Sequence, residues 1–286
     1  MKRKMSLLFL LMMGLFFVTA CSDDDDDYNP NYNPDKEVRD AFQQMFPNAT
    51  QVTWGEQSSY AVANFVNNKV ANTAWFSKDG VWYLTQTEIA LNAIPKPITD
   101  AIAKSKYASL TTASASMLDR SGMTSAYLIE MTGGKSVTDL YYTPDGYLFD
   151  ENEQSSLGTK AMPMPVDQTI SAMVSQNYAG AKIVYIDTDD GYNITLLENN
   201  VYFHYILNKN YKWIQTEYAQ SFENVPDNVK NALKDDGYAF NVEYDTVTRL
   251  VRPDGNNKIT VYRFEMDNST GQKTVYYTAD GVKLDE

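Results

Sequence analysis

Few residues of this 286-residue chain could carry out chemistry. His204 is the only histidine, so a Ser-His-Asp triad would have to be built on it, and a histidine-rich metal site is excluded. Its neighbours alternate as in a strand, with Phe203 and Tyr205 on the side opposite His204. This pattern predicts that His204 packs on a sheet face and is not a catalytic base.

An acidic stretch offers the next candidate for chemistry. Asp187, Asp189 and Glu198 have the spacing of some calcium-loop ligands, but Gly191 stands one position too early for that loop. The residues that follow Gly191 alternate like a strand, which favours a hairpin over a calcium site. Paired carboxylates that meet only in space would escape a sequence pattern, so a hydrolase remains the alternative from another functional class. We expect no cofactor, no metal site and no catalytic residue.

Cys21 is the only cysteine, which excludes an internal disulfide, a CxxC pair and a thiolate zinc site. Residues 1–20 have the anatomy of a secretory signal, because three basic residues precede an apolar run that is short for a transmembrane helix. The segment Val18 to Cys21 resembles a bacterial lipobox. The resemblance implies that Cys21 is lipidated and anchors the mature protein in a membrane.

Residues 21–35 are predicted to form a tether. Asp23 to Asp27 look like the signal that sends Bacteroidetes lipoproteins to the outer-membrane surface, and Tyr28 to Asp35 are polar and interrupted by proline. We therefore expect an outer-membrane lipoprotein exposed at the cell surface. The alternatives are a purely solvated spacer and attachment to the periplasmic leaflet.

The chain is acidic, with 37 acidic against 24 basic residues and a net charge of −13. This charge argues against nucleic acid as a partner. Tyrosine is abundant, with 21 residues, and its large ring and hydroxyl suit binding surfaces as well as ordinary sheet faces.

An internal repeat organises the folded part. Residues 141–146 read Tyr-Tyr-Thr-Pro-Asp-Gly, and residues 276–281 read Tyr-Tyr-Thr-Ala-Asp-Gly, each typical of a strand entering a hairpin. We predict a first domain at 36–149, a linker at 150–165 and a second domain at 166–286. Each domain is expected to contain a duplicated unit of one helix and four antiparallel strands, an α+β architecture with the helices on one face of the sheet.

The motifs of the first repeat resemble those of the PepSY-like family of secreted Bacteroidetes proteins. The matching residues are Phe46-Pro47, Trp54, the segment Trp75 to Trp82 and Ile94-Pro95. The resemblance implies two tandem copies of the fold of the β-lactamase inhibitor protein, without catalytic residues. It also suggests that the modules bind or inhibit other proteins.

Strand alternation sorts the tyrosines by face. The residues expected to face the helices are Trp82, Leu84, Leu140, Tyr142, Val275 and Tyr277. The opposite face would then carry the candidate binding residues Tyr83, Tyr141, Tyr202 and Tyr276. We expect a monomeric, non-enzymatic, lipid-anchored module that binds an unknown protein, peptide or glycan, with a carbohydrate-binding accessory lipoprotein as an alternative.

The anchor makes a direct prediction. A Cys21→Ala variant should leave a soluble or unprocessed protein, because membrane attachment is assigned to the acylated cysteine alone. Cell fractionation measures it, and a variant that still partitions with the outer membrane would show that the anchor lies elsewhere.

The acidic run makes a separate prediction. Neutral replacements of Asp23 to Asp27 should preserve acylation but reduce protease accessibility in whole cells, if the run directs export to the surface. Unchanged accessibility would identify it as a spacer.

Overall fold

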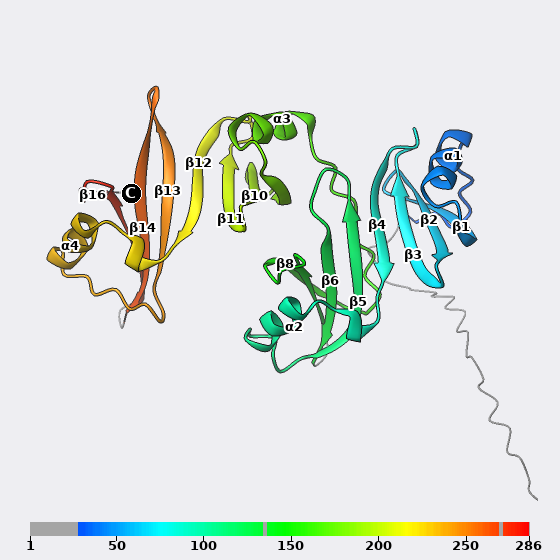
Figure 1. Cartoon of the computed structure of the whole chain (residues 1–286), viewed down its shortest axis with the longest axis horizontal. Coiled ribbons are helices and arrows are strands. Elements are labelled where there is room, and N and C mark those ends of the chain that lie inside the picture. The colour runs from blue at the N-terminus through cyan, green and yellow to red at the C-terminus, as the bar shows by residue number, and fades with distance from the viewer. Residues whose placement is uncertain (1–27, 134–135, 269–270, 286) are drawn as a thin grey trace, which may run out of the picture.

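The computed structural model describes residues 28–133, 136–268 and 271–285. These residues form two eight-stranded antiparallel sheets in which every strand lies beside its neighbour in sequence. Figure 1 shows the sheets side by side along the long axis of the molecule, with β1 and β16 at opposite ends. Cys21 and the acidic run lie outside the described residues, and no helix within those residues is long and apolar enough to cross a membrane.

The first repeat contains α1 (Lys36–Met45), β1 (Thr50–Gln57), β2 (Tyr60–Asn67), β3 (Val70–Phe76), β4 (Trp82–Glu88), α2 (Lys96–Ala103), β5 (Thr111–Arg120), β6 (Ala126–Thr132), β7 (Val137–Tyr142) and β8 (Leu148–Gln154). The second repeat contains α3 (Gln168–Asn177), β9 (Lys182–Asp187), β10 (Tyr192–Glu198), β11 (Val201–Leu207), β12 (Trp213–Gln220), α4 (Asp227–Asp235), β13 (Thr246–Asp254), β14 (Asn257–Asn268), β15 (Gly271–Thr278) and β16 (Lys283–Leu284).

The two helix-plus-four-strand units of each repeat share one sheet. β4 pairs with β5 from Leu84 opposite Arg120 to Glu88 opposite Ser116, and β12 pairs with β13 in the same way. The order of elements therefore agrees with the predicted tandem α+β architecture, and each repeat forms one continuous sheet.

Both helices of the first repeat pack on the same face of its sheet. Phe42 of α1 contacts Phe65 and Phe76, whereas Ile98 of α2 packs in a cluster with Ile129 and Leu140. The strand register shows that these two clusters lie on the same face, because directly paired residues share a face. One row of paired residues runs from β3 to β6 through Asn72, Thr87, Met117 and Tyr127. We call this side the helix face and the other side the open face.

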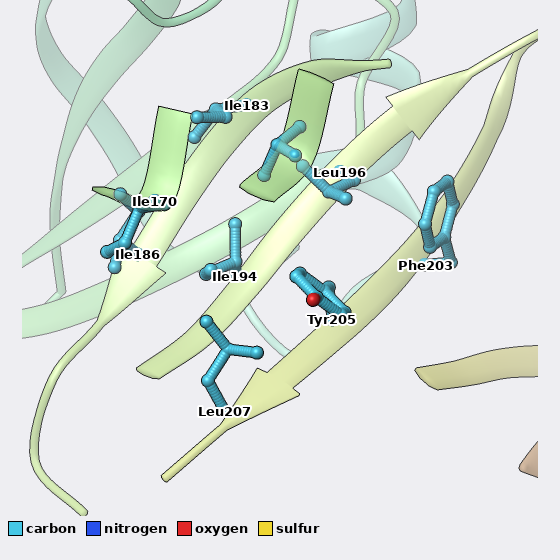
Figure 2. Packing of buried hydrophobic residues seen from close by; sticks show 9 residues of the cluster. Ile170, Ile183, Ile186, Ile194, Leu196, Phe203, Tyr205 and Leu207 are labelled. Carbon is cyan, nitrogen blue, oxygen red and sulfur yellow. The ribbon is translucent and has the colours of Figure 1, made fainter. Parts of the chain in front are cut away.

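The second repeat follows the same plan. Ile170 and Val174 of α3 pack on a cluster that includes Ile194, Leu196 and Tyr205 (Figure 2). Asp167 caps this helix by accepting hydrogen bonds from the backbone N–H groups of Thr169 and Ile170.

A β-bulge changes one predicted assignment. Trp82 pairs with Phe76 and packs on the helix face, but Leu84 pairs with Trp75 and packs on the open face with Leu118 and Leu128. The prediction that Leu84 faces the helices is therefore wrong, because the extra residue at Tyr83 inverts the alternation.

The segment after the acidic run does not behave as a free stalk. Asn29 exchanges two backbone hydrogen bonds with Glu56, at 2.8 and 2.9 Å. Tyr32 packs beside the α1 cluster and Pro34 is buried. The described part of the predicted tether is thus docked on the first repeat.

The expected linker at 150–165 is also largely structured. β8 extends to Gln154, and Ala161 is buried in the cluster on the open face of the first sheet. We call residues 155–161 the strap. It crosses the open face of the first sheet before the chain reaches α3.

The repeats also touch each other. Tyr202 stacks on Tyr147, with ring centroids 3.9 Å apart, and its Oη donates to Asp145 Oδ1 at 2.5 Å. The backbone N–H of Thr124 donates to the carbonyl of Ile183 on β9 at 2.9 Å. These contacts tie the edge of the second sheet to turns of the first repeat.

The strap makes a prediction about domain boundaries. A fragment of residues 28–165 should unfold cooperatively on heating, whereas a fragment of residues 28–154 should be less stable and bind a hydrophobic dye. The reason is that removal of the strap uncovers the apolar open face. Thermal unfolding followed by circular dichroism compares the two, and equal melting temperatures would contradict the role of the strap.

Candidate binding face

The four predicted tyrosines do not form one continuous surface. Tyr83 lies edge-on to Tyr60, and Tyr141 packs against Phe149 in the open-face cluster of the first sheet. Tyr202 is engaged with the first repeat. Tyr276 lies on the open face of the second sheet, as Tyr202 does, and the guanidinium of Arg252 is 5.5 Å from the Tyr276 ring centroid.

The open face of the first sheet is apolar and covered. Its main side chains are Trp75, Leu84, Leu118 and Leu128, each at most 2% exposed. Ala161 of the strap packs into the same cluster. Burial of these side chains explains why a segment with linker composition is held in place.

Two polar side chains of the sheet hold the backbone of the strap. Oε1 of Glu130 on β6 accepts hydrogen bonds from the N–H groups of Gly158 and Thr159, at 2.7 and 3.0 Å. Gln86 on β4 accepts from the N–H of Ala161 at 3.0 Å and donates to the carbonyl of Thr159 at 3.0 Å. All four bonds are to the backbone, so these two side chains recognise the main chain of the strap and not a particular side chain.

Glu130 and Asp139 stand opposite each other on β6 and β7, and both carboxylates are buried. Burial raises the pKa of Asp139 above its usual range. Glu130 is instead held by the two strap N–H groups and by the hydroxyl of Ser114. This carboxylate pair lies beneath the strap, which is poor placement for a hydrolytic pair that must reach a substrate.

The second sheet also has acidic side chains at the positions equivalent to Gln86 and Glu130. In the described residues, no segment of the chain lies across them as the strap does in the first sheet. Gln86 pairs with Leu118 as Glu217 pairs with Leu250, so Glu217 takes the place of Gln86. Glu265 takes the place of Glu130. The hydroxyl of Thr246 donates to Glu265 Oε2 at 3.1 Å, just as that of Ser114 donates to Glu130 Oε2.

The open face of the second sheet keeps buried apolar residues at Leu250 and Val261, in the places of Leu118 and Ala126, but it is charged at neighbouring positions. Arg263 stands where the first sheet has Leu128, and it makes a forked ion pair to Glu217, with distances of 3.3 and 3.1 Å. Its Nε lies 3.1 Å from Glu265 Oε1. The Arg263 and Glu217 side chains keep 22% and 14% of their surface exposed, so solvent and a ligand can reach this network.

His204 borders the same network. Its Nδ1 lies 3.3 Å from Thr195 Oγ1, and it pairs across the strands with Glu217. Burial lowers the pKa of His204, so the ring is neutral at physiological pH. Its place on a sheet face agrees with the prediction from strand alternation.

The acidic stretch at 187–191 forms a hairpin, because β9 ends at Asp187 and β10 begins at Tyr192. Within 28–133, 136–268 and 271–285, no group of three or more His, Cys, Asp or Glu side chains is arranged to hold a metal ion.

Strand patterns place Glu217, Arg263 and Glu265 near one face but do not mark them as a site. Their special position appears only when Gln86 and Glu130 are seen holding the strap. The sequence signal that could have found them is the alignment of the two repeats, in which Glu217 is equivalent to Gln86.

Two neighbouring carboxylates should respond to mutation in opposite ways. Asp139→Asn should raise the free energy of unfolding at pH 7, because a carboxyl whose folded pKa is raised destabilises the fold when ionised. This cost is absent below the unfolded pKa of about 4 and fully present above the folded pKa, so the gain should vanish near pH 3. Urea unfolding at both pH values measures it, and a loss at pH 7 would contradict the assignment.

Glu130→Ala should instead destabilise the protein, by about 1–3 kcal/mol, because two backbone N–H groups of the strap lose their acceptor. The same urea titration applies. Lys106→Ala is the matched control, since it breaks an exposed ion pair and should leave the urea midpoint nearly unchanged.

Comparison with known proteins places this architecture. A BLIP-like protein from Bacteroides fragilis is 23% identical, with a TM-score of 0.43, over 46% of this chain and 94% of its own. A DUF2874 family protein from Bacteroides ovatus is 25% identical, with a TM-score of 0.42, over 44% of this chain and 95% of its own. No curated protein matches the chain. The model of the PepSY-like family, described as beta-lactamase-inhibitor-like, matches residues 58–150 and 207–284, which is more than half of the chain, and the protein therefore belongs to this family.

Proposed function

We propose that the protein is a non-enzymatic, lipid-anchored envelope protein whose second sheet binds an extended peptide segment of a partner protein. Membership in the beta-lactamase-inhibitor-like family supports an inhibitor-like binding module. The anchor is assigned to Cys21, and the location to the outer membrane, from the sequence alone.

The observation that carries the proposal is the strap. Gln86 and Glu130 of the first sheet hold the backbone of residues 158–161 by four hydrogen bonds. The chain thus contains its own example of an irregular segment held by its backbone across the open face. A second sheet with the same strand order presents Glu217 and Glu265 at the equivalent positions.

The chemistry of the second face defines the peptide it would accept. Glu217 and Glu265 offer carboxylate acceptors for backbone N–H groups, and Arg263 offers donors for carbonyl oxygens or for an acidic side chain. Tyr276 supplies an aromatic edge beside Arg252. Apolar side chains would find little to pack on, so the partner segment should be polar and extended.

The arrangement of carboxylates argues against an envelope hydrolase. The buried pair Glu130 and Asp139 lies under the strap, and the polar network of the second sheet is paired internally between Arg263, Glu217 and Glu265. Neither the pocket that Asp119 lines nor the pocket between Gly122 and Ile183 is lined by a pair of carboxylates.

Peptides displayed on phage can test the proposal. Selection on the whole mature protein should yield extended peptides, and Glu217→Ala combined with Arg263→Ala should weaken their binding by at least about tenfold, or about 1.4 kcal/mol. Glu217 and Arg263 are removed together so that neither is left without the other, and Glu265 keeps its hydrogen bond from Thr246.

The matched control is Lys106→Ala with Glu151→Ala, which removes an exposed ion pair on the first repeat. The control should bind the selected peptides as the parent does. Peptides that bind the Glu217/Arg263 double variant unchanged would place the binding surface elsewhere, and the failure of any peptide to bind would reject the proposed function.

A further inference from the structure

The helix face of the first repeat contains a pocket of about 540 Å³ that the peptide-binding proposal does not use. The end of α1 forms one wall through Met45 and Phe46. The floor consists of Asn72 on β3, Thr85 on β4 and Asp119 on β5. A volume of this size lies within the range of about 300–1,000 Å³ typical of small-molecule sites.

The second repeat shows that the fold does not require this pocket. Asn72 pairs with Thr87, and the equivalent pair in the second sheet is Phe203 with Tyr218, whose rings stack at 5.0 Å. Tyr178 stands where the first repeat has Phe46, and its ring lies 5.1 Å from Phe203. In the first repeat, amide and hydroxyl groups line this space. In the second repeat, aromatic rings fill it.

A hydrogen bond shared by the two repeats supports the same conclusion. In both repeats a tryptophan Nε1 donates to a threonine hydroxyl: Trp82 to Thr85 at 2.9 Å, and Trp213 to Thr216 at 3.2 Å. In the second repeat this threonine also bonds Tyr178 Oη at 2.6 Å. No tyrosine hydroxyl is present at residue 46, so the Thr85 hydroxyl lines the pocket.

The polar groups of the floor are held in place by their neighbours. The Thr87 hydroxyl donates to Asn72 Oδ1 at 2.7 Å, and Asn72 Nδ2 donates to the carbonyl of Val70 at 2.8 Å. Ser125 donates to one carboxylate oxygen of Asp119 at 2.9 Å. The floor is therefore a fixed set of hydroxyl, amide and carboxylate groups, which is the form of a prearranged site.

The charge of the pocket limits the ligand. Arg120 is the one basic residue among those lining it, but its guanidinium donates to the carbonyl of Thr124 and lies over the ring of Phe149 on the open face. Asp119 is thus the charged group that a ligand would meet. An anion is disfavoured, while a neutral ligand with many hydroxyl groups could both donate to Asp119 and exchange hydrogen bonds with the threonines.

We infer that this pocket binds a neutral saccharide of one or two sugar units. The hydroxyl groups of a sugar match the floor of Asn72, Thr85, Thr87 and Asp119, and its C–H face matches the apolar wall of Phe46, Met45 and Trp82. The inference is independent of peptide binding, because the two sites lie on opposite faces of different sheets.

The second repeat supplies the variant that tests it. Asn72→Phe combined with Thr87→Tyr copies the aromatic pair of the second repeat into the first and should fill the pocket without unfolding the sheet. Asn193→Phe is the matched control, since it makes the same kind of exchange at an exposed strand position of the second sheet. Thermal unfolding of all three proteins checks that each is folded.

Isothermal titration of the whole mature protein uses a panel of neutral mono- and disaccharides, with spermidine as a cationic probe. At least one saccharide should bind the parent and the control alike, and binding should fall by at least about tenfold in the filled variant. Binding of spermidine alone, no binding of any saccharide at millimolar concentration, or saccharide binding that survives in the folded filled variant would each overturn the inference.

Discussion

The backbone hydrogen bonds that Glu130 accepts from Gly158 and Thr159 are the interaction on which the first repeat depends. Its sheet is apolar on both faces, and the helices α1 and α2 cover only one of them. A buried sheet face needs a second layer, and the strap supplies it. Because the strap carries few large apolar groups, its position relies on Glu130 and Gln86 gripping its backbone as well as on Ala161.

The two repeats use one scaffold in opposite ways. The first repeat closes its open face with its own chain and leaves a polar pocket on its helix face. The second repeat fills the equivalent helix-face space with Tyr178, Phe203 and Tyr218 and keeps a charged, partly exposed network on its open face. The two repeats thus keep one strand order but differ in which face is covered and where polar groups are exposed.

Much of the architecture could be predicted from the sequence, because the repeat and the hairpin signals are local. The repeated motifs at 141–146 and 276–281 coincide with the turns that follow β7 and β15, as predicted. Leu84 was misplaced because a bulge has no strong signature in alternation. Residues 150–165 have the composition of a linker, with Gly158, Pro163 and Pro165 among polar residues, whereas the burial of the strap depends on long-range partners at Gln86 and Glu130. The tyrosines were assigned to one binding face because strand alternation reveals a side of a sheet and not what covers it.

Amide hydrogen exchange of the free protein tests the central claim, that the first sheet already holds the strap on its open face. The account predicts that the amides of Gly158, Thr159 and Ala161 exchange slowly, together with those of β4 and β6, and that Glu130→Ala releases Gly158 and Thr159 to fast exchange. Exchange of these amides in the parent protein at the rate of an exposed loop would contradict it.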